Sequence, residues 1–253
     1  MLARADQYIH QDLEMAAEFQ RAVLPEYPSV TYLSCSILFH PCGHVSGDVY
    51  NFQLNREREI AVYLGDATGH GITAALMTML VHLSLENFPG NLGTDEVLRR
   101  LNSMIARHKT GLSIASQMFR VSPDGTLCVT HAGQPSLIVQ PRSHDGHVVF
   151  DQGGCPIGMF TDEKVPYVEE TWKLNRGDRL IAYTDGLVDW KNHQGRSFGF
   201  DRLADILASS RDSTLEELPQ TVHSAVTGFA RGVQNQDDVT LLCFEYDPDG
   251  HEI

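Results

Sequence analysis

The first segment of the chain, residues 2–24, has the spacing of an amphipathic helix that ends before Pro25. One row of positions alternates four and three residues apart, as in a heptad repeat: Ile9, Leu13, Ala16, Gln20 and Val23. The row is short and contains a glutamine, so an isolated coiled coil of this length would be marginal. Two interpretations stay open: a terminal helix packed on its own domain, and a signalling or dimerising linker from an upstream domain.

From Thr31 onward, short runs of β-forming residues separated by turn signals replace the helical spacing. Strands are expected over 31–40, 49–54, 59–64, 113–121, 126–131, 137–140, 147–150, 167–174, 179–184 and 239–246, with 167–174 and 179–184 as a pair. Helices are expected over 71–85, 94–107 with Thr94 as its N-cap, 200–208 and 215–231. This order of elements predicts one β-rich α+β domain with helices on its outer faces.

Composition narrows the class of protein. The chain has 253 residues, of which 42% are hydrophobic, and this suits one domain with a sizeable core. The apolar stretch 72–85 is interrupted by threonine and histidine, and residues 1–14 carry acids, so neither a membrane span nor a signal peptide is expected. The five cysteines form no CxxC pair, which predicts buried thiols in a reducing cytoplasm. The formal charge of −14 argues against nucleic acid as a partner.

Four short motifs place aspartates where a predicted strand begins or ends. They are SGDVY with Asp48, GDATGHG with Asp66, YTDG with Asp185, and QDDVT with Asp237 and Asp238. Each motif alone is typical of a turn or of a solvated strand end. Carboxylate oxygens suit Mg²⁺ or Mn²⁺, and several facing carboxylates would repel one another without cations between them. In combination, the motifs therefore predict a divalent-metal site at one end of the sheets.

In this order and spacing, the motifs resemble the SpoIIE/RsbU-like branch of the metal-dependent (PPM, type 2C) serine/threonine protein phosphatases. The resemblance covers about residues 12–246 and rests on QRAVLP, SGDVYNF, GDATGHGITAAL, THAGQPSLIV, GGCPIG, the run 177–203 and the motif at 236–242. It implies an α-β-β-α sandwich of two antiparallel sheets flanked by helices, with the metals at one end. Residues 1–27 would be an N-terminal linker or signalling helix, and residues 28–249 the phosphatase domain.

The resemblance also implies a site. The catalytic residues would be Asp48, Asp66, Asp185 and Asp237, and the metal ligands these four with Ala67 and Asp238. Asp66 would bridge two Mn²⁺ or Mg²⁺ ions, with the Ala67 carbonyl on one of them. Asp185 and Asp237 would complete the shell of the other ion, and Asp48 would be a ligand directly or through water. Asp238 is the less expected member of its pair, since the family's ligand is the first acid there.

Catalysis by metal-activated water needs no serine or cysteine nucleophile. Thr68 stands where human-type relatives have a histidine, and His70 is expected to bond locally at a helix start, so no general acid is assigned. Ser46 replaces a glycine of the family motif, Asn51 replaces a common acid, and Asp189 replaces a glutamate. None of these differences removes a predicted ligand.

The function implied is that of a cytoplasmic phosphatase in a bacterial signalling pathway. Its substrate would be phosphoserine or phosphothreonine on a regulatory protein such as an anti-sigma-factor antagonist. The domain would be the output of a longer regulator with an upstream sensor or receiver, coupled through the N-terminal helix and a homodimer, and without a membrane partner. Two alternatives are a catalytically quiet binding module that sequesters a regulatory protein, and a hydrolase of phosphorylated metabolites. The retained aspartates argue against the first, and the missing GxxxxGK[ST] loop against the second.

Overall fold

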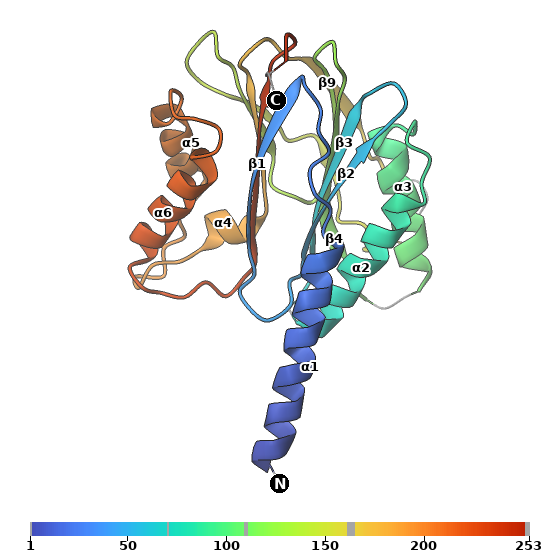
Figure 1. Ribbon diagram of the computed structural model, residues 1–253, viewed down its shortest axis with the longest axis vertical. Helices are drawn as coiled ribbons and strands as arrows, with labels where there is room; N and C mark the ends of the chain where they lie inside the picture. The colour runs from blue at the N-terminus through green and yellow to red at the C-terminus, as the bar shows by residue number, and fades with distance from the viewer. Residues whose placement is uncertain (1, 70, 109–110, 161–164, 251–253) are drawn as a thin grey trace.

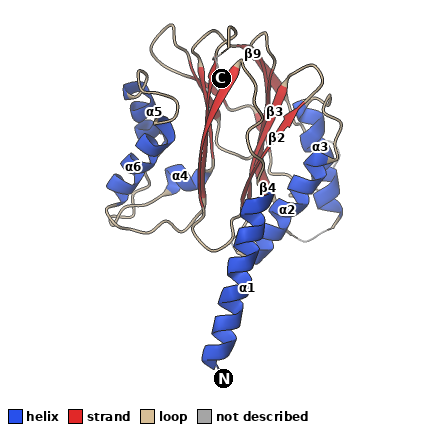
Figure 2. Cartoon of the chain, in the orientation of Figure 1, coloured by secondary structure: helices blue, strands red, loops and turns tan. Residues whose placement is uncertain are grey.

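The structure, a computed structural model, describes residues 2–69, 71–108, 111–160 and 165–250. Two β-sheets face each other, and helices cover both outer faces (Figure 1). Figure 2 shows the resulting layers, with strands in the middle and helices on either side. This is the α+β sandwich that the family resemblance implied.

The sandwich has a five-stranded and a six-stranded sheet. The first has the order β1-β11-β10-β6-β7 and consists of β1 (Leu33–His40), β6 (Leu137–Gln140), β7 (Val148–Phe150), β10 (Arg179–Tyr183) and β11 (Val239–Tyr246). The second has the order β2-β3-β4-β5-β8, with β9 also paired to β5. Its strands are β2 (Asp48–Leu54), β3 (Ile60–Ala67), β4 (Ile114–Val121), β5 (Thr126–Ala132), β8 (Gly153–Gly154) and β9 (Glu169–Lys173). The pairings are antiparallel except for the short parallel contact of β5 with β8.

Three apolar layers hold the sandwich together. Between the sheets, alternate residues of facing strands are buried, and the rings of Phe119 and Phe244 meet with centroids 5.4 Å apart. Helices α2 (Ile72–Glu86) and α3 (Thr94–Arg107) bury a second layer on the six-stranded sheet. Helices α4 (Asp185–Asp189), α5 (Phe200–Ser209) and α6 (Leu218–Ala230) bury a third on the five-stranded sheet. None of the described helices is long and apolar enough to cross a membrane.

Helix α1 (Leu2–Val23) extends away from the sandwich and packs on it mainly with its C-terminal half (Figure 1). The His10 ring also meets the His44 ring of the β1–β2 loop, with centroids 4.6 Å apart. Ala17 is buried there in a small apolar cluster with Val45 and with Ala75 of α2. Of the predicted apolar row, Gln20 is buried, whereas Ile9 is 59% exposed. The helix thus packs on its own domain at one end and leaves it at the other.

One predicted strand pair is wrong. Strand β9 pairs with β5 in one sheet, whereas β10 pairs with β6 and β11 in the other. The turn between them crosses from sheet to sheet, and it is fixed by Asp178, whose carboxylate accepts the amides of Asn175 and Arg142 at 2.8 Å each. A turn motif predicts a reversal of the chain, but it does not say which strand pairs with which.

The predicted N-cap of α3 is also wrong. Gly93 occupies the N-cap position, and no side chain of that position caps the helix. Instead, the Glu169 carboxylate of β9 accepts the Thr94 amide at 3.0 Å and the Thr94 hydroxyl at 2.7 Å. The carboxylate that satisfies this helix start comes from a distant strand, so local sequence could not reveal it.

The cysteines differ from their prediction as well. All five are free thiols, but only Cys243 is buried, and Cys42 lies exposed on the loop between β1 and β2. Partial burial and the neighbouring Asp238 carboxylate raise the pKa of Cys42 to about 11. The Cys42 thiol is therefore a poor nucleophile at neutral pH.

Candidate metal centre

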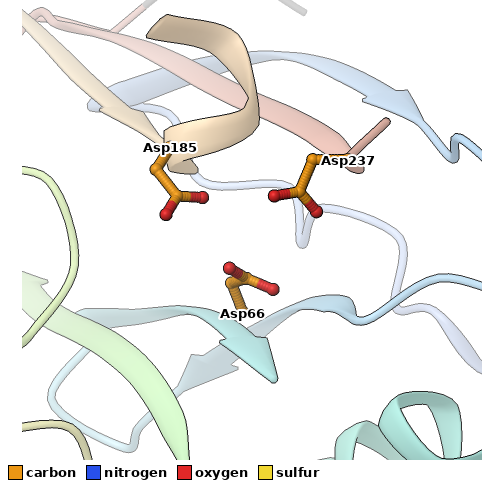
Figure 3. A group of neighbouring side chains, drawn as sticks. All are labelled: Asp66, Asp185 and Asp237. Atoms are coloured by element: carbon orange, nitrogen blue, oxygen red, sulfur yellow. The ribbon is translucent and has the colours of Figure 1, made fainter. Parts of the chain in front are cut away.

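Three of the predicted acids meet at one end of the sandwich. One carboxylate oxygen from each of Asp66, Asp185 and Asp237 lies within 4.8 Å of the other two. Figure 3 shows the three carboxylates pointing toward one another from separate elements. Asp66 lies near the end of β3, Asp185 begins α4 directly after β10, and Asp237 lies just before β11. Strand ends from both sheets therefore converge here.

Asp48 lies beside this group and faces the other sheet. It is opposite Asp66 in the β2–β3 register and is 1% exposed. Its Oδ2 accepts hydrogen bonds from the Thr184 hydroxyl at 2.8 Å and the Thr240 hydroxyl at 2.6 Å. The Thr184 hydroxyl also accepts the Thr240 amide at 2.9 Å. These bonds tie the two sheets together next to Asp185 and hold the Asp48 carboxylate in place.

The second acid of the Asp237–Asp238 pair has a different environment. Its Oδ1 accepts the Cys42 amide at 2.7 Å, and its Oδ2 accepts the Gly47 amide at 2.6 Å. Both oxygens of Asp238 therefore hold the β1–β2 loop that leads to Asp48. Of the two neighbouring acids, Asp237 has its carboxylate next to those of Asp66 and Asp185, whereas Asp238 does not belong to this group.

The Ala67 carbonyl, a predicted ligand, lies where the β1–β2 loop approaches closely. The Ala67 amide donates to the Gly47 carbonyl at 2.9 Å, and a Cβ on Gly47 would lie 3.2 Å from the Ala67 carbonyl oxygen. The Ile114 amide, opposite Ala67 in the strand register, donates to the Ile157 carbonyl instead. A glycine at position 47 thus lets the loop approach without crowding this carbonyl.

Burial and mutual repulsion dominate the electrostatics of the site. Burial, followed by the charges of Asp48, Asp185 and Asp237, raises the pKa of Asp66 to about 9. Burial also raises the pKa values of Asp185 and Asp237. Burial raises the pKa of Asp48 well above its usual value, although the hydroxyl donors Thr240 and Thr184 oppose the rise. Without cations, this arrangement of carboxylates resists ionisation.

The same residues fit divalent cations. Buried Oδ1 atoms of Asp48 and Asp185 have no hydrogen-bond partner in the described structure. Unsatisfied buried carboxylate oxygens are costly, and oxygen ligands are those that Mg²⁺ and Mn²⁺ prefer. Bound cations would both supply the missing partners and offset the repulsion that raises the pKa of Asp66. The donor set therefore fits the predicted ions.

The residues at which the chain differs from the family motifs form hydrogen bonds or close polar contacts in the loops and strands near the acids. The Thr68 hydroxyl donates to the Ser113 carbonyl at 2.7 Å and accepts the Ser113 amide at 2.9 Å. Ser46 tolerates its Cβ without a positive φ, and its hydroxyl accepts the Asp48 amide at 3.0 Å. Asn51 lies 3.1 Å from a His82 ring nitrogen. His70 lies outside the described residues.

Sequence reasoning missed Gln20 as part of the site's support. Its side-chain oxygen accepts the Ser46 amide at 2.8 Å, and its nitrogen donates to the Ser46 carbonyl at 2.7 Å. Ser46 is two residues before Asp48, so α1 contacts the loop that carries this acid. A glutamine in an apolar helical row was the available signal, because a buried amide needs polar partners. Thr184 and Thr240 were missed too, although both belong to the acidic motifs.

A buried histidine on β5 leads to a prediction about pH. His131 on β5 is 2% exposed, and neither ring nitrogen has a partner in the described structure. Burial lowers the pKa of His131 to about 4, although the charge of Asp151 opposes the shift. Below pH 6.5 the unfolded chain binds a proton here that the folded protein does not bind until about pH 4.

Folding stability should therefore fall as the pH drops through this window. His131→Asn, which keeps a polar side chain but has no titratable ring, should remove that loss. The drop in the free energy of unfolding between pH 7 and pH 5 should then be smaller than in the wild type by about 1–3 kcal/mol. Urea unfolding of both proteins at pH 7 and pH 5 measures the difference. His144→Asn, at an exposed histidine, is the matched control. An equal pH dependence in wild type and His131→Asn would contradict the prediction.

Comparisons with known proteins show the family and the fold of the chain. The family model described as Stage II sporulation protein E (SpoIIE) matches residues 56–247. The SiaA-PP2C domain of Pseudomonas aeruginosa superimposes with a TM-score of 0.84 at 23% identity, covering 97% of this chain and all of that one. The fold is therefore that of a PP2C-type phosphatase domain. Within that class, the chain belongs to the SpoIIE family.

Two relatives with known names also match. The chain is 25% identical to the phosphoserine phosphatase RsbP of Bacillus subtilis (strain 168), over 92% of this chain and 57% of RsbP. It is 23% identical to protein IcfG of Synechocystis sp. (strain ATCC 27184 / PCC 6803 / Kazusa), over 91% of this chain and 41% of IcfG. The chain thus spans about half the length of these relatives.

Proposed function

We propose that this chain is a metal-dependent protein phosphatase that hydrolyses phosphoserine or phosphothreonine on a regulatory protein in a bacterial signalling pathway. The observation that carries the proposal is the convergence of Asp66, Asp185 and Asp237 from strand ends of both sheets. Membership of the SpoIIE family and the name of RsbP support the reaction and the substrate class. An anti-sigma-factor antagonist in the cytoplasm is the substrate that we propose.

The residues in and around the metal centre would have separate roles. Asp66, Asp185 and Asp237 would hold two Mn²⁺ or Mg²⁺ ions, with Asp48 as a further ligand directly or through water. When bound, these ions would lower the pKa of a water and offset the charge of the phosphoryl oxygens. The hydroxyls of Thr184 and Thr240 would keep Asp48 in position, and Asp238 would keep the β1–β2 loop in position.

Phosphate release tests the proposal. The protein should release phosphate from a phosphoserine peptide with Mn²⁺ or Mg²⁺, and it should stop when EDTA is added. Parallel assays with phosphorylated metabolites decide between protein and small-molecule substrates. A catalytically quiet adaptor would bind the phosphoprotein without turnover, and that result under all metal conditions would contradict the proposal.

We further propose that α1 couples an upstream sensor or receiver domain to this centre through a homodimer. Gln20 supports the coupling, because it joins α1 to the backbone of Ser46 near Asp48. The dimer is supported by large apolar side chains that α1 exposes: Tyr8 at 68%, Met15 at 68% and Phe19 at 63%. At 100° per residue these three share one side of the helix, and a second copy would cover them.

Substitutions on this side of α1 test the dimer. Met15→Glu combined with Phe19→Glu should convert a dimer into a monomer, because a pair of carboxylates would then lie in an apolar interface. Light scattering coupled to size-exclusion chromatography measures the mass. Glu18→Gln, an exposed position on another side of α1, is the control. A wild-type protein that stays monomeric at about 100 μM would contradict the dimer without affecting the proposed reaction.

A further inference from the structure

A hollow of about 530 Å³ opens beside the metal centre. The predicted ligand Asp237 lines it, together with residues of two segments, 186–195 and 233–236. Lys191 and His193 are its basic side chains, and Asp189 adds an acid. A substrate residue next to a phosphoserine bound at the metal centre could therefore extend into this hollow.

The two walls of the hollow are fastened to each other. The Trp190 indole, next to Lys191 in the chain, donates to the Val233 carbonyl at 2.9 Å. The Asn235 side-chain nitrogen donates to the Asp237 carbonyl at 2.8 Å and to the Gly186 carbonyl at 3.3 Å. These contacts connect both walls to the backbone of the two motifs that carry Asp185 and Asp237. The hollow is thus preformed, which lowers the entropy cost of binding a peptide there.

The wall that carries Lys191 is a rigid turn. Lys191 and Ser197 form an antiparallel bridge. Between them, the Asn192 side-chain oxygen accepts the amides of Gln194 at 2.9 Å and Arg196 at 3.1 Å. An Asx turn of this kind fixes the backbone of the loop. The base of the Lys191 side chain is therefore held at a defined place on the rim.

Charge identifies the kind of residue that this hollow fits. The whole chain has a formal charge of −14, and the hollow is lined by the acids Asp189 and Asp237 as well as by Lys191 and His193. Lys191 is exposed, and within the described ranges its ammonium has neither an ion pair nor a hydrogen bond. If Asp237 is held by the metal ions, the unpaired Lys191 ammonium is free to attract a carboxylate of the substrate.

We propose that the hollow binds an acidic residue that flanks the phosphoserine of the substrate, with the Lys191 ammonium donating to its carboxylate. This inference rests on the proposed function and deepens it by naming a determinant of specificity. Lys191 contacts the flanking residue, whereas the phosphate itself belongs to the metal centre. The substrate class is therefore an acidic phosphoserine segment.

A series of peptides tests this assignment. One glutamate is moved from three residues before the phosphoserine to three residues after it, and matched peptides carry glutamine at the same place. We expect the wild type to prefer glutamate at one or two adjacent positions by about threefold to fivefold in kcat/KM, the range of an exposed ion pair. Lys191→Met should abolish this ratio, and Lys191→Glu should shift the preference to lysine at the same position.

Controls separate this inference from the proposed function. Lys173→Met alters an exposed lysine that already pairs with Asp124 at 3.0 Å, and it should keep the wild-type ratio. A wild-type enzyme without any glutamate preference, or with one that survives Lys191→Met, overturns the inference. An equal loss on all peptides and on p-nitrophenyl phosphate overturns it as well, since Lys191 would then contact the phosphate. If no substrate is turned over, fluorescence anisotropy of the same peptides on the Mn²⁺-loaded protein decides the preference independently of catalysis.

Discussion

Asp66→Asn should abolish metal-dependent phosphate release, with a loss of about a thousandfold or more in kcat/KM. Asp66 is the only member of the group that comes from the six-stranded sheet, facing Asp185 and Asp237 from the other side (Figure 3). An asparagine offers one neutral oxygen and turns an amide N–H₂ toward the remaining site. It can therefore neither bridge two cations nor balance their charge. Phosphate-release assays measure the loss of turnover, and Mn²⁺ titration calorimetry measures the loss of metal binding.

The free energy of unfolding of the metal-free protein distinguishes a metal-ligand role of Asp66 from a structural role. The pKa of Asp66 is about 9 in the folded protein, compared with 3.8 as its ordinary value. The folded state therefore holds a proton that the unfolded chain releases, and metal-free stability falls as the pH rises from about 4 to about 9. Metal-free Asp66→Asn should lack this loss and be at least as stable as the wild type at pH 8.

Chemical unfolding in EDTA across this pH range checks the prediction. Asp145→Asn is a matched control, because its side chain is fully exposed. A metal-free Asp66→Asn protein that is clearly less stable than the wild type at pH 8 would indicate that Asp66 supports the fold. Retention of Mn²⁺ binding and turnover would contradict the proposed ligand role.

Gly186→Ala should destabilise the protein by about 3 kcal/mol or more and should weaken metal binding as well. A Cβ on Gly186 would lie 2.0 Å from the backbone carbonyl oxygen of Asp238. Because the clashing oxygen belongs to the backbone, the clash is relieved only if α4 moves away from β11. Because Asp185 begins α4 and Asp237 precedes β11, such a movement would separate two of the three converging carboxylates.

Gly228→Ala in α6 is the matched control for this substitution. A Cβ on Gly228 would meet no atom within 4 Å, and alanine is favoured over glycine in a helix interior by about 0.5–1 kcal/mol. Gly228→Ala should therefore stabilise the protein and leave metal affinity unchanged. Thermal unfolding and Mn²⁺ titration of both variants give the comparison. Wild-type stability in Gly186→Ala would show that α4 is free to move.

Local patterns predicted those elements whose burial is periodic. The helix predicted over 94–107 is α3, and the four apolar residues that share one face of it are buried: Val97, Leu98, Leu101 and Ile105. The two-residue β8 and the five-residue α4 are too short to show a period, and they were not predicted. The pairing of 167–174 with 179–184 failed, because strand partners are chosen by contacts between distant segments.

The sequence by itself determined the acidic motifs of the centre, their order along the chain and their positions at strand ends. It did so because a turn and a strand boundary depend on neighbouring residues. The family resemblance already favoured Asp237 over Asp238 as the ligand, but only the tertiary structure assigned Asp238 its own role, which is to hold the β1–β2 loop. It also decided that Thr184 and Thr240 hold Asp48, and that Lys191 shares a hollow with Asp237. These relations join residues up to 196 positions apart in the chain, and only the packing of the two sheets brings them together.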